Sequence, residues 1–539
     1  MRPLGAVVLL ALAMLPACQP KVVNYTLAVV TSGCAGANPF QGVQFLRIRI
    51  TGDGLMAPIE ATAPAGERAA TLPEIPAGAN RVIEVRAYDG DPASGGRVVS
   101  IGRTLPFTVP DVVPDLMSEA ELTKRVFLRQ VNTWAAAVSA TDPTNCQPMR
   151  VARAGHTATL LRNGKVFIAG GFNYPPGNPN RVALSDAEVF DPSTGTFSKV
   201  QDLSFRTSQQ VVKVTKAFHT ANLLKNGQVV VWGGENYQLL QGVNVVSPRS
   251  EIIFYDPDQD AYGATQRQTP APIPRSQHRA VVDQNGKLLV IGGLRFNTTG
   301  SGPRLVPVSE VEWFDPDVQP QVPQVIAGLS AQRVEASVAP VKQGEFIAVA
   351  GGTDGTMLRA DVQFFRWNGR AFEQQVQSNP PRLGDPGRRG AAAVPFREGN
   401  DMLVLGGYSD VSAVRPVASS EIVQAGVATV ARGADIGTRG DVCAVTLNDG
   451  SVLAIGGRTA DTTGMMVRSD ASTVIVRPDG RGGTNALAGP GLMRARYLHT
   501  CTLLADGSVL VTGGLDETPA NPIGEVLADA WIYTPAPTD

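Results

Sequence analysis

Seven Gly-Gly pairs recur along the chain at intervals of 50 to 63 residues. Each pair closes an apolar run such as 166–169, and a turn signal such as Asn163-Gly164 stands just before that run. Asn-Gly is typical of a two-residue hairpin turn, so each unit is expected to contain a pair of antiparallel strands. Small sheets repeated at this period can bury both faces only by stacking on their neighbours. The pairs are Gly170-Gly171, Gly233-Gly234, Gly292-Gly293, Gly351-Gly352, Gly406-Gly407, Gly456-Gly457 and Gly513-Gly514.

Further features follow each pair in a fixed order. A third strand is introduced by a motif such as Ser185-Asp186-Ala187-Glu188, and in three units it ends in Asp-Pro, which favours a type I turn. A fourth strand carries an aromatic residue, for example Phe197. Four antiparallel strands repeated around a ring make the blades of a propeller.

The order Arg-x-x-His, turn glycine, Gly-Gly, Ser-x-Glu and Asp-Pro resembles the kelch repeat over residues 150–539. The resemblance implies an all-β, seven-bladed propeller of the galactose-oxidase type. The last unit ends soon after its third strand, and Thr133-Trp134-Ala135-Ala136 resembles the fourth strand of the first unit. We therefore expect residues 131–137 to complete the seventh blade.

The N-terminus has the pattern of an export signal: Arg2 precedes an apolar stretch too short to span a bilayer. That stretch closes with Leu15-Pro16-Ala17-Cys18, which resembles the lipobox of bacterial lipoproteins, so residues 1–18 are expected to end at an acylated Cys18. Gln19 favours outer-membrane sorting by the same resemblance. The expected location is the bacterial cell envelope, facing the periplasm or the exterior. The alternative is an ordinary secretory signal with an incidental cysteine.

Residues 19–128 lack the repeat and alternate in polarity, as in Leu46-Arg47-Ile48-Arg49-Ile50, between clusters of Gly, Pro and Asp. This pattern predicts a small β-sandwich, with an immunoglobulin-like topology as the commonest choice. We expect it to act as a spacer between the membrane and a propeller over residues 129–539.

Four further cysteines remain, an even number that favours disulfides in an exported protein. A bond between Cys34 and Cys146 is preferred because it would tie the N-terminal domain to the start of the propeller. Cys443 and Cys501 lie in comparable strands of adjacent repeats but one position out of step. Because neighbouring residues on a strand face opposite ways, the sequence argues against their bond.

The sequence favours a binding protein over an enzyme. All four histidines, His156, His219, His278 and His499, fill the same repeat position, which blade packing explains without ligands. An arc of these histidines around a metal is the minority interpretation. The five tryptophans fall on framework strands, and no catalytic elbow, phosphate loop or zinc spacing is found. No cofactor or metal is therefore expected. The alternative is a sugar-active enzyme, an oxidase or isomerase, on the same fold.

A binding face is expected where the inner strands begin and the loops after Gly-Gly emerge. These loops carry Tyr174, Tyr237, Phe296 and Tyr408, and variable loops on a rigid scaffold are where recognition resides. The same face receives one basic residue from each blade: Arg153, Lys216, Arg275, Arg333, Arg388, Arg439 and Arg496. Seven cations at a channel mouth would attract an anionic ligand, a peptide or a carboxylated glycan. The competing interpretation is that each cation caps strand carbonyls or pairs with a nearby carboxylate.

The expected function is therefore a ligand-binding or scaffolding module at the cell envelope, held to the membrane by its lipid and monomeric. A formal net charge of −1 with no long basic run argues against a nucleic-acid partner.

Overall fold

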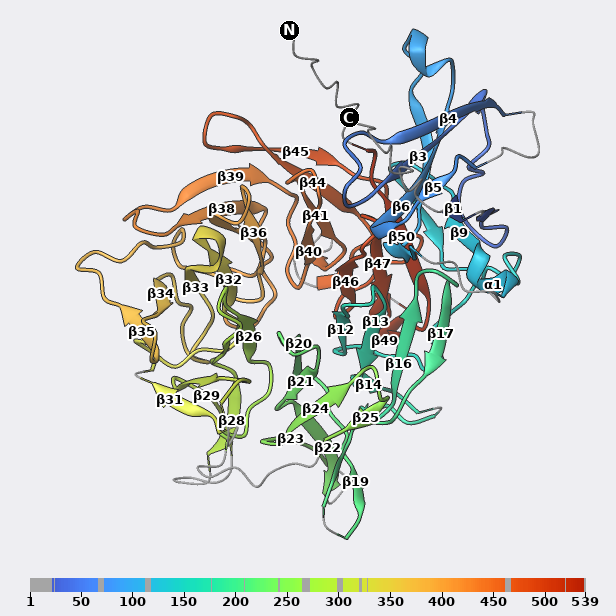
Figure 1. Ribbon diagram of the computed structural model, residues 1–539. Coiled ribbons are helices and arrows are strands. Elements are labelled where there is room, and N and C mark those ends of the chain that lie inside the picture. The colour runs from blue at the N-terminus through green and yellow to red at the C-terminus, as the bar shows by residue number, and fades with distance from the viewer. Residues whose placement is uncertain are drawn as a thin grey trace, which may run out of the picture.

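Seven four-stranded antiparallel sheets follow one another along the described part of the chain in a computed structural model. The structure describes residues 22–23, 25–65, 72–111, 118–175, 177–207, 209–240, 243–263, 272–297, 304–318, 322–326, 328–460, 467–518 and 520–537. In Figure 1 the ribbon colours pass once around a ring, from blue-green through yellow and orange to red. The expected all-β propeller fold is confirmed. We number the sheets as blades 1 to 7 in chain order.

Each blade runs from the centre of the ring outward in the same strand order. The innermost strands are β12 (Thr157–Leu160), β20 (Thr220–Leu223), β26 (Arg279–Val282), β32 (Ser337–Val341), β36 (Ala392–Phe396), β40 (Cys443–Thr446) and β46 (Thr500–Leu503). The second strands are β13 (Val166–Ala169), β21 (Val229–Trp232), β27 (Leu288–Ile291), β33 (Phe346–Ala350), β37 (Asp401–Leu405), β41 (Val452–Ile455) and β47 (Val509–Thr512). The third strands are β16 (Ala187–Asp191), β24 (Ile252–Asp256), β30 (Val311–Phe314), β34 (Val362–Trp367), β38 (Ser419–Gln424), β44 (Thr473–Pro478) and β50 (Ala530–Thr534). The outermost strands are β17 (Thr196–Lys199), β25 (Ala261–Tyr262), β31 (Gln324–Ile326), β35 (Phe372–Gln375), β39 (Ala431–Asp435), β45 (Thr484–Ala488) and β11 (Thr133–Ala136).

The ring closes through β11, as the sequence predicted. This strand precedes blade 1 in the chain but pairs with β50, so that Trp134 lies opposite Tyr533. The innermost strands contact one another in turn, and β46 of blade 7 contacts β12 of blade 1. In a closed ring every blade has a neighbour on both faces, so each small sheet buries the apolar side chains of both faces.

The Gly-Gly pairs hold adjacent blades together. In every pair the second glycine donates its N–H to the carbonyl of the basic residue in the next blade, at 2.8 to 3.1 Å. The first glycines have φ of 57 to 68° and the second glycines 92 to 105°. At Gly170 an added Cβ would lie 2.4 Å from the carbonyl oxygen of Lys216, so the close approach requires glycine. The last of these hydrogen bonds, from Gly514 to Arg153, crosses the junction between the two ends of the ring.

The hairpin turns inside the blades differ from the two-residue type that the sequence predicted. In blade 1, Leu161 N–H donates to Lys165 O and Gly164 N–H donates to Leu161 O, which makes a three-residue loop. Only the glycine of Asn163-Gly164 has a positive φ, and the Asn163 side chain accepts the N–H of Lys165 instead. This is the standard three-residue hairpin, in which glycine alone takes the left-handed position.

Five blades carry an additional hairpin after Gly-Gly, the position from which recognition loops were expected to emerge. These hairpins are β14 (Phe172–Asn173) with β15 (Val182–Ala183), β22 (Glu235–Leu240) with β23 (Val243–Pro248), β28 (Leu294–Asn297) with β29 (Arg304–Pro307), β42 (Arg458–Ala460) with β43 (Val467–Ser469), and β48 (Leu515–Thr518) with β49 (Asn521–Val526). Blades 4 and 5 carry short loops there. Elsewhere, β18 (Ser204–Arg206) pairs with β19 (Val211–Lys213), and a 3-10 turn, η2 (Lys342–Gly344), lies between β32 and β33.

The N-terminal domain has one main sheet and two small sheets that share one apolar core. Its main sheet has the order β10 (Arg129–Gln130), β7 (Val98–Arg103), β6 (Gly78–Tyr88), β3 (Phe45–Thr51) and β4 (Ile59–Pro64), with β8 (Phe107–Val109) paired to β6. The remaining elements are β1 (Val22–Val23) paired with β5 (Ile75–Pro76), β2 (Thr26–Val30) paired in parallel with β9 (Thr123–Phe127), η1 (Pro92–Ser94) and the short helix α1 (Glu119–Leu122). The sheet extends to Gln130, two residues beyond the expected boundary. The immunoglobulin-like topology stays a prediction.

Two disulfides brace the fold. Cys34–Cys146 joins the N-terminal domain to the start of the propeller, as predicted. Cys443–Cys501 joins β40 of blade 6 to β46 of blade 7, so the argument against this bond is wrong. Adjacent blades stack face against face, so a side chain that points forward from one blade meets one that points backward from the next. Two cysteines that are one repeat position apart in adjacent blades therefore point toward each other and can form a disulfide.

The predicted lipid site at Cys18 and residues 1–18 lie outside the described residues. No helix in the described part of the chain is long and apolar enough to cross a membrane.

Candidate functional site

The four histidines lie between blades and are 2 to 8% exposed. Nε2 of His219 is 2.9 Å from the Thr157 hydroxyl of the preceding blade, and His278 and Thr220 repeat this contact. Burial, together with the neighbouring cations, lowers the pKa of His219 to about 3 and lowers that of His278 well below its usual value. The histidines are therefore uncharged at neutral pH and pack against the Gly-Gly turns.

Replacing His219 by Gln should reduce the loss in the free energy of unfolding that occurs when the pH is lowered. The unfolded histidine takes up its proton near pH 6.5 and the folded one near pH 3, so stability is lost as the pH falls below 6.5. Between pH 7 and pH 5 this single group accounts for roughly 2 kcal/mol of the lost free energy of unfolding. Urea titrations of the wild type and His219→Gln at both pH values measure the difference. An equal loss in the two proteins would show that His219 does not titrate between the folded and unfolded states.

The seven basic residues are buried, with 0 to 4% of each exposed. Arg153 donates to the Gly170 carbonyl at 2.8 Å and to the Glu188 carboxylate at 2.7 Å. The others bond strand or glycine carbonyls and pair with a carboxylate of their own blade in the same way. The expected ligand-binding ring of Arg153, Lys216, Arg275, Arg333, Arg388, Arg439 and Arg496 is therefore corrected, because their charge is used inside the blades.

The four predicted aromatic residues do not form one surface. Tyr174 and Tyr237 both pack on the edge of the buried Phe172 ring, with centroids at 5.9 and 6.3 Å. Phe296 lies half-buried in β28 of blade 3. Tyr408 of blade 5 is fully buried, and its hydroxyl donates to Asp441 at 2.8 Å.

The centre of this face is formed by the third residue of each Arg-x-x-His motif, which we call the axial position. All seven axial residues have left-handed φ values, from 51 to 62°. Their main chains join around the axis: Phe218 N–H donates to Gly155 O at 2.9 Å, and four further junctions repeat the bond among the described residues. The axial residues are Gly155, Phe218, Gln277, Glu335, Gly390, Asp441 and Leu498.

Two further positions surround the axial ring. The second residue of each motif forms an isolated antiparallel bridge with the residue after Gly-Gly, in all seven blades. These bridged pairs are Ala154 with Phe172, Ala217 with Glu235, Ser276 with Leu294, Val334 with Thr353, Arg389 with Tyr408, Gly440 with Arg458, and Tyr497 with Leu515. We call the axial residues and the bridged pairs together the mouth.

The mouth is apolar on one side and polar on the other. Ala154, Phe172, Ala217, Tyr497 and Leu515 share one buried cluster around blades 7, 1 and 2, against which the axial Phe218 and Leu498 pack. The opposite side, on blades 3 to 6, carries amide, carboxylate, guanidinium and phenol groups. A rigid backbone ring with one apolar and one polar arc is suited to a ligand that has both kinds of surface.

The polar arc is built from linked pairs. Arg389 holds the Glu335 carboxylate with two hydrogen bonds of 2.6 Å. Arg458 pairs with Glu517 at 3.2 Å and lies over the Tyr497 ring, while the Tyr497 hydroxyl donates to the same carboxylate. Two-point arginine pairs fix both partners in orientation.

Asp441 differs from the other carboxylates of the polar arc. Within the described residues, its side chain accepts a hydrogen bond from the Tyr408 hydroxyl and forms no ion pair. Burial, together with the nearby Glu335 carboxylate, raises the pKa of Asp441 to about 6. This carboxyl group therefore changes charge within the physiological pH range, where it can either accept or donate a hydrogen bond.

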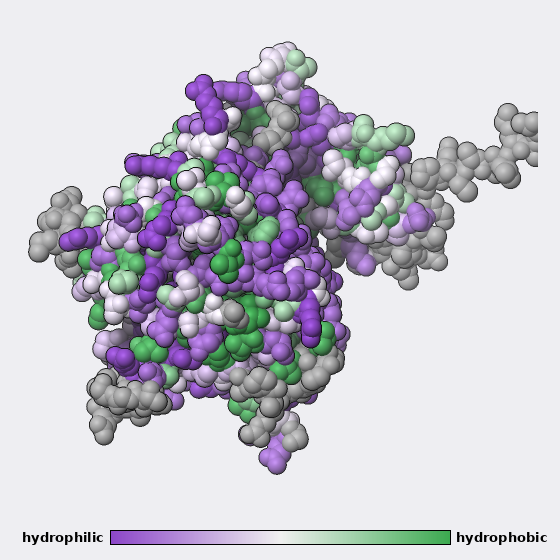
Figure 2. All heavy atoms as spheres, turned by 90° about the vertical axis from the view of Figure 1, so that its left-hand side faces the viewer, coloured by the Kyte–Doolittle hydropathy of each residue, from purple (hydrophilic) through white to green (hydrophobic). Residues whose placement is uncertain are grey.

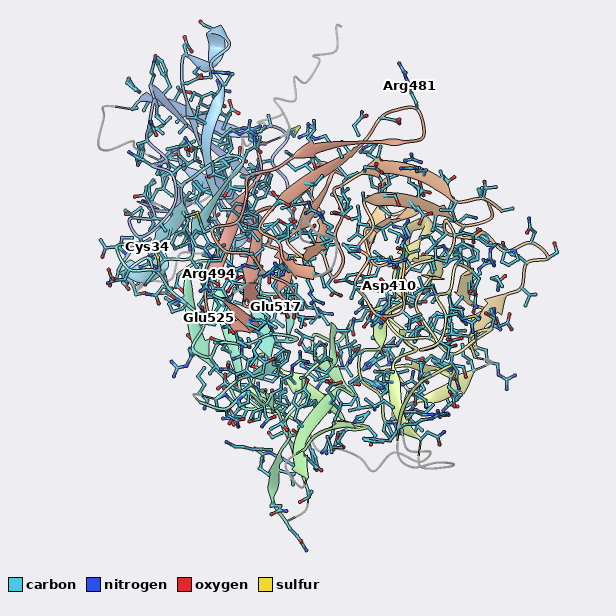
Figure 3. The ribbon with its side chains drawn as sticks, turned by 180° about the vertical axis from the view of Figure 1, so that it is seen from behind. Cys34, Asp410, Arg481, Arg494, Glu517 and Glu525 are labelled. Atoms are coloured by element: carbon cyan, nitrogen blue, oxygen red, sulfur yellow. A yellow bond between two sulfur atoms is a disulfide. The ribbon has the colours of Figure 1, made fainter. Side chains whose placement is uncertain are left out.

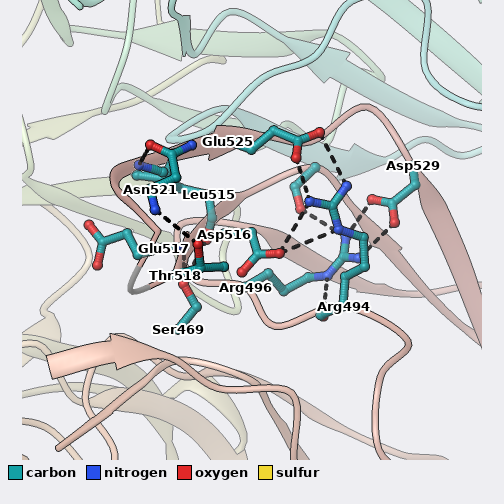
Figure 4. Close-up of polar contacts among 12 residues, drawn as sticks. Ser469, Arg494, Arg496, Leu515, Asp516, Glu517, Thr518, Asn521, Glu525 and Asp529 are labelled. Carbon is teal, nitrogen blue, oxygen red and sulfur yellow. Dashed lines mark hydrogen bonds and ion pairs between the residues drawn. The ribbon is translucent and has the colours of Figure 1, made fainter. Parts of the chain in front are cut away.

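The extra hairpins form a partial wall around the mouth. β43 contacts β48, β15 contacts β22, and β23 contacts β28, whereas blades 4 and 5 contribute only short loops. Glu517 on the β48–β49 hairpin and Asp410 on the blade 5 loop lie on opposite sides of the ring centre in Figure 3. Arg494 fixes the β48–β49 hairpin through Asp516 and Glu525, at 3.2 and 2.7 Å (Figure 4). The mouth is thus enclosed on one side and more open beside blades 4 and 5.

Apart from Tyr408, the mouth residues were not singled out by the sequence prediction, although the repeat contains a signal for them. Framework positions hold the same residue type in most blades, whereas the axial and bridged positions hold a different residue in almost every blade. At these positions the backbone conformation repeats but the residue type does not. The fold therefore does not require these particular side chains.

A copper centre does not fit these residues. The histidines face the blade interfaces, and no group of three His, Cys, Asp or Glu residues that could hold a metal ion is found within the described ranges.

A family model and one solved structure agree with this architecture. A family model described as the Kelch motif matches residues 152–204. The fold is similar to that of a fungal alcohol oxidase of the AA5 family in complex with copper, at 16% identity and a TM-score of 0.51, over 75% of this chain and 76% of that one. The structure of YjhT matches at 14% identity and a TM-score of 0.41, over 63% of this chain and 99% of that one. No curated protein matches the chain. At such identities the likeness concerns the fold alone.

Proposed function

Because the chain is a kelch-repeat β-propeller protein, we propose that it is a recognition module of the bacterial cell envelope that holds its ligand at the mouth. The observation that carries this proposal is the non-repeating set of side chains on a repeated backbone ring. Cys18 would anchor the chain through its lipid. The N-terminal domain contacts the hairpin turn of blade 7, where Arg103 donates to Asp506 O at 3.0 Å. This turn lies at the end of the blade away from the mouth, so an anchored propeller would present the mouth outward.

The ligand class follows from the two arcs of the mouth. An apolar ring face or aliphatic segment would lie against Phe218 and Leu498, and hydroxyl or amide groups would meet the polar arc. Both a saccharide and a protein segment have such surfaces. The outer side formed by blades 4 and 5 is mostly hydrophilic with small separate apolar patches (Figure 2), which favours the mouth over that side as a docking surface.

Replacing Asp441 by Asn tests this function. If a ligand donates to the Asp441 carboxylate, affinity should rise as the pH increases from 5 to 7, through the pKa of about 6. The Asn variant should bind at least about tenfold more weakly at pH 7 and lose this pH dependence, since a hydrogen bond to a charged group contributes roughly 1.5–3 kcal/mol. Binding of the full chain to arrays of envelope glycans and peptides, followed by calorimetry at three pH values, measures both effects.

The matched control is Asp410→Asn, because Asp410 caps its own loop by accepting the N–H groups of Val414 and Arg415. Unchanged binding in Asp441→Asn, or an equal loss in Asp410→Asn, would contradict a ligand site at the mouth.

A sugar-active enzyme is the second candidate, and the raised pKa of Asp441 beside the Tyr408 phenol favours it. A carboxyl group with such a pKa can serve as a general acid near neutral pH. Turnover of simple sugars, measured with and without copper and compared with Asp441→Asn, separates this candidate from pure binding.

A further inference from the structure

A second concave site lies on the mouth face, between the β28–β29 hairpin of blade 3 and the loop after Gly352 in blade 4. It is a cleft of about 560 Å³, lined by ten described residues of the two blades. This size is within the range of small-ligand sites. None of the mouth residues lines it, so it is separate from the site proposed above.

The cleft carries one more positive charge than negative charge. Arg304 and Arg359 line it together with one carboxylate, Asp354. Arg304 is exposed at the start of β29. Hydrogen bonds from Thr356 and Met357 and the adjacent Arg359 outweigh burial and lower the pKa of Asp354 to about 2, so this carboxylate stays charged at neutral pH.

Arg359 lines the cleft and is held in place by Asp354, which pairs with one end of its guanidinium. Two guanidinium groups at one cleft are suited to a carboxylate, which accepts hydrogen bonds at two oxygens.

The remaining lining favours a sugar over a peptide strand. Gln332, Thr356 and Asp354 offer an amide, a hydroxyl and a carboxylate to hydroxyl groups, and Val306 and Pro307 give a short apolar wall. An extended peptide would have to add to the edge of β29, a strand of four residues in which Pro307 has no N–H to donate. We propose that this cleft binds a carboxylated saccharide, with the uronate group held by Arg304 and Arg359.

Calorimetry on the full chain tests the cleft with three probes: trigalacturonate, the neutral galactose trimer and hexaglutamate. Trigalacturonate should bind, and the neutral trimer should bind at least about tenfold more weakly. Arg304→Gln should weaken trigalacturonate binding about fivefold to tenfold. Arg481→Gln, which removes the same charge from an exposed turn at the outer edge of the ring (Figure 3), should leave it unchanged.

Asp354→Asn should change the affinity in the opposite direction from Arg304→Gln. A purely structural role of Asp354 would not produce an increase in affinity. The substitution removes the carboxylate that competes for Arg359, so affinity for trigalacturonate should increase about threefold, while Asp410→Asn should have no effect. Equal binding of the neutral trimer, no response to Arg304→Gln, or preferred binding of hexaglutamate would overturn the proposal. Asp441→Asn should leave trigalacturonate binding intact, so the outcome at the cleft is independent of the outcome at the mouth.

Discussion

Arg275→Ala should lower the free energy of unfolding by about 3–5 kcal/mol, because it leaves a buried carboxylate without its cation. Arg275 is fully buried, and its Nη2 lies 2.7 Å from Glu312, which is 1% exposed. The same guanidinium donates to the carbonyls of Gly292 and Glu310, so the alanine variant loses three partners at once. Chemical denaturation at pH 7 measures the loss.

Two further variants show whether the unpaired buried carboxylate causes the loss of stability in Arg275→Ala. Arg382→Ala removes an exposed arginine that is 4.0 Å from Asp385, and it should change stability by less than about 0.5 kcal/mol. The double variant Arg275→Met with Glu312→Leu should recover much of the loss, since an apolar pair of similar volume no longer buries a lone charge. A double variant as unstable as Arg275→Ala would show that carbonyl capping, and not the carboxylate, sets the cost.

The seven cations show what a repeat can predict and where it fails. Their presence in every blade was visible in the sequence, and pairing with a nearby carboxylate was one of the two interpretations. The sequence does not show whether these basic side chains point into the blade or toward solvent. Alternation along a strand indicates only which face of the sheet a side chain lies on. Of the two interpretations, the structure supports the one in which Arg153 and its equivalents cap carbonyls and pair within the blade.

Other features were predictable to the extent that they depend on short-range rules. Turn glycines, strand limits and the origin of β11 follow from local patterns, and Cys34–Cys146 follows from domain connection. Cys443–Cys501 was missed because a rule for one sheet was applied to two stacked sheets. Apart from Tyr408, the mouth was missed because residues such as Glu335, Arg389 and Asp441 come from three blades, and only the closed ring brings them together.

The closure of the ring by β11 leads to the second large prediction. Trp134 is 6% exposed, its indole N–H donates to Pro490 O of blade 6 at 2.8 Å, and its ring lies 5.3 Å from that of Tyr533. Trp134→Ala should therefore lower the free energy of unfolding by about 3–5 kcal/mol.

Ala135→Pro should act more specifically, on the pairing of β11 with β50. The N–H of Ala136 points outward to Ala35 O and that of Ala137 inward to Ala530 O, so alternation directs the N–H of Ala135 toward β50.

A proline at position 135 removes that ladder hydrogen bond and should release β11 from β50, leaving an open strand edge on blade 7. Size-exclusion chromatography with light scattering should then show a larger molar mass for the variant than for the wild type. Trp367→Ala is the control, since it deletes an indole from blade 4 and should reduce stability without creating oligomers. Because Cys34–Cys146 and the Ala35 contact hold the segment from its other side, reduction of the disulfides should increase the effect of Ala135→Pro. A variant that stays monomeric after reduction would mean that blade 7 is stable with three strands and that β11 only covers it.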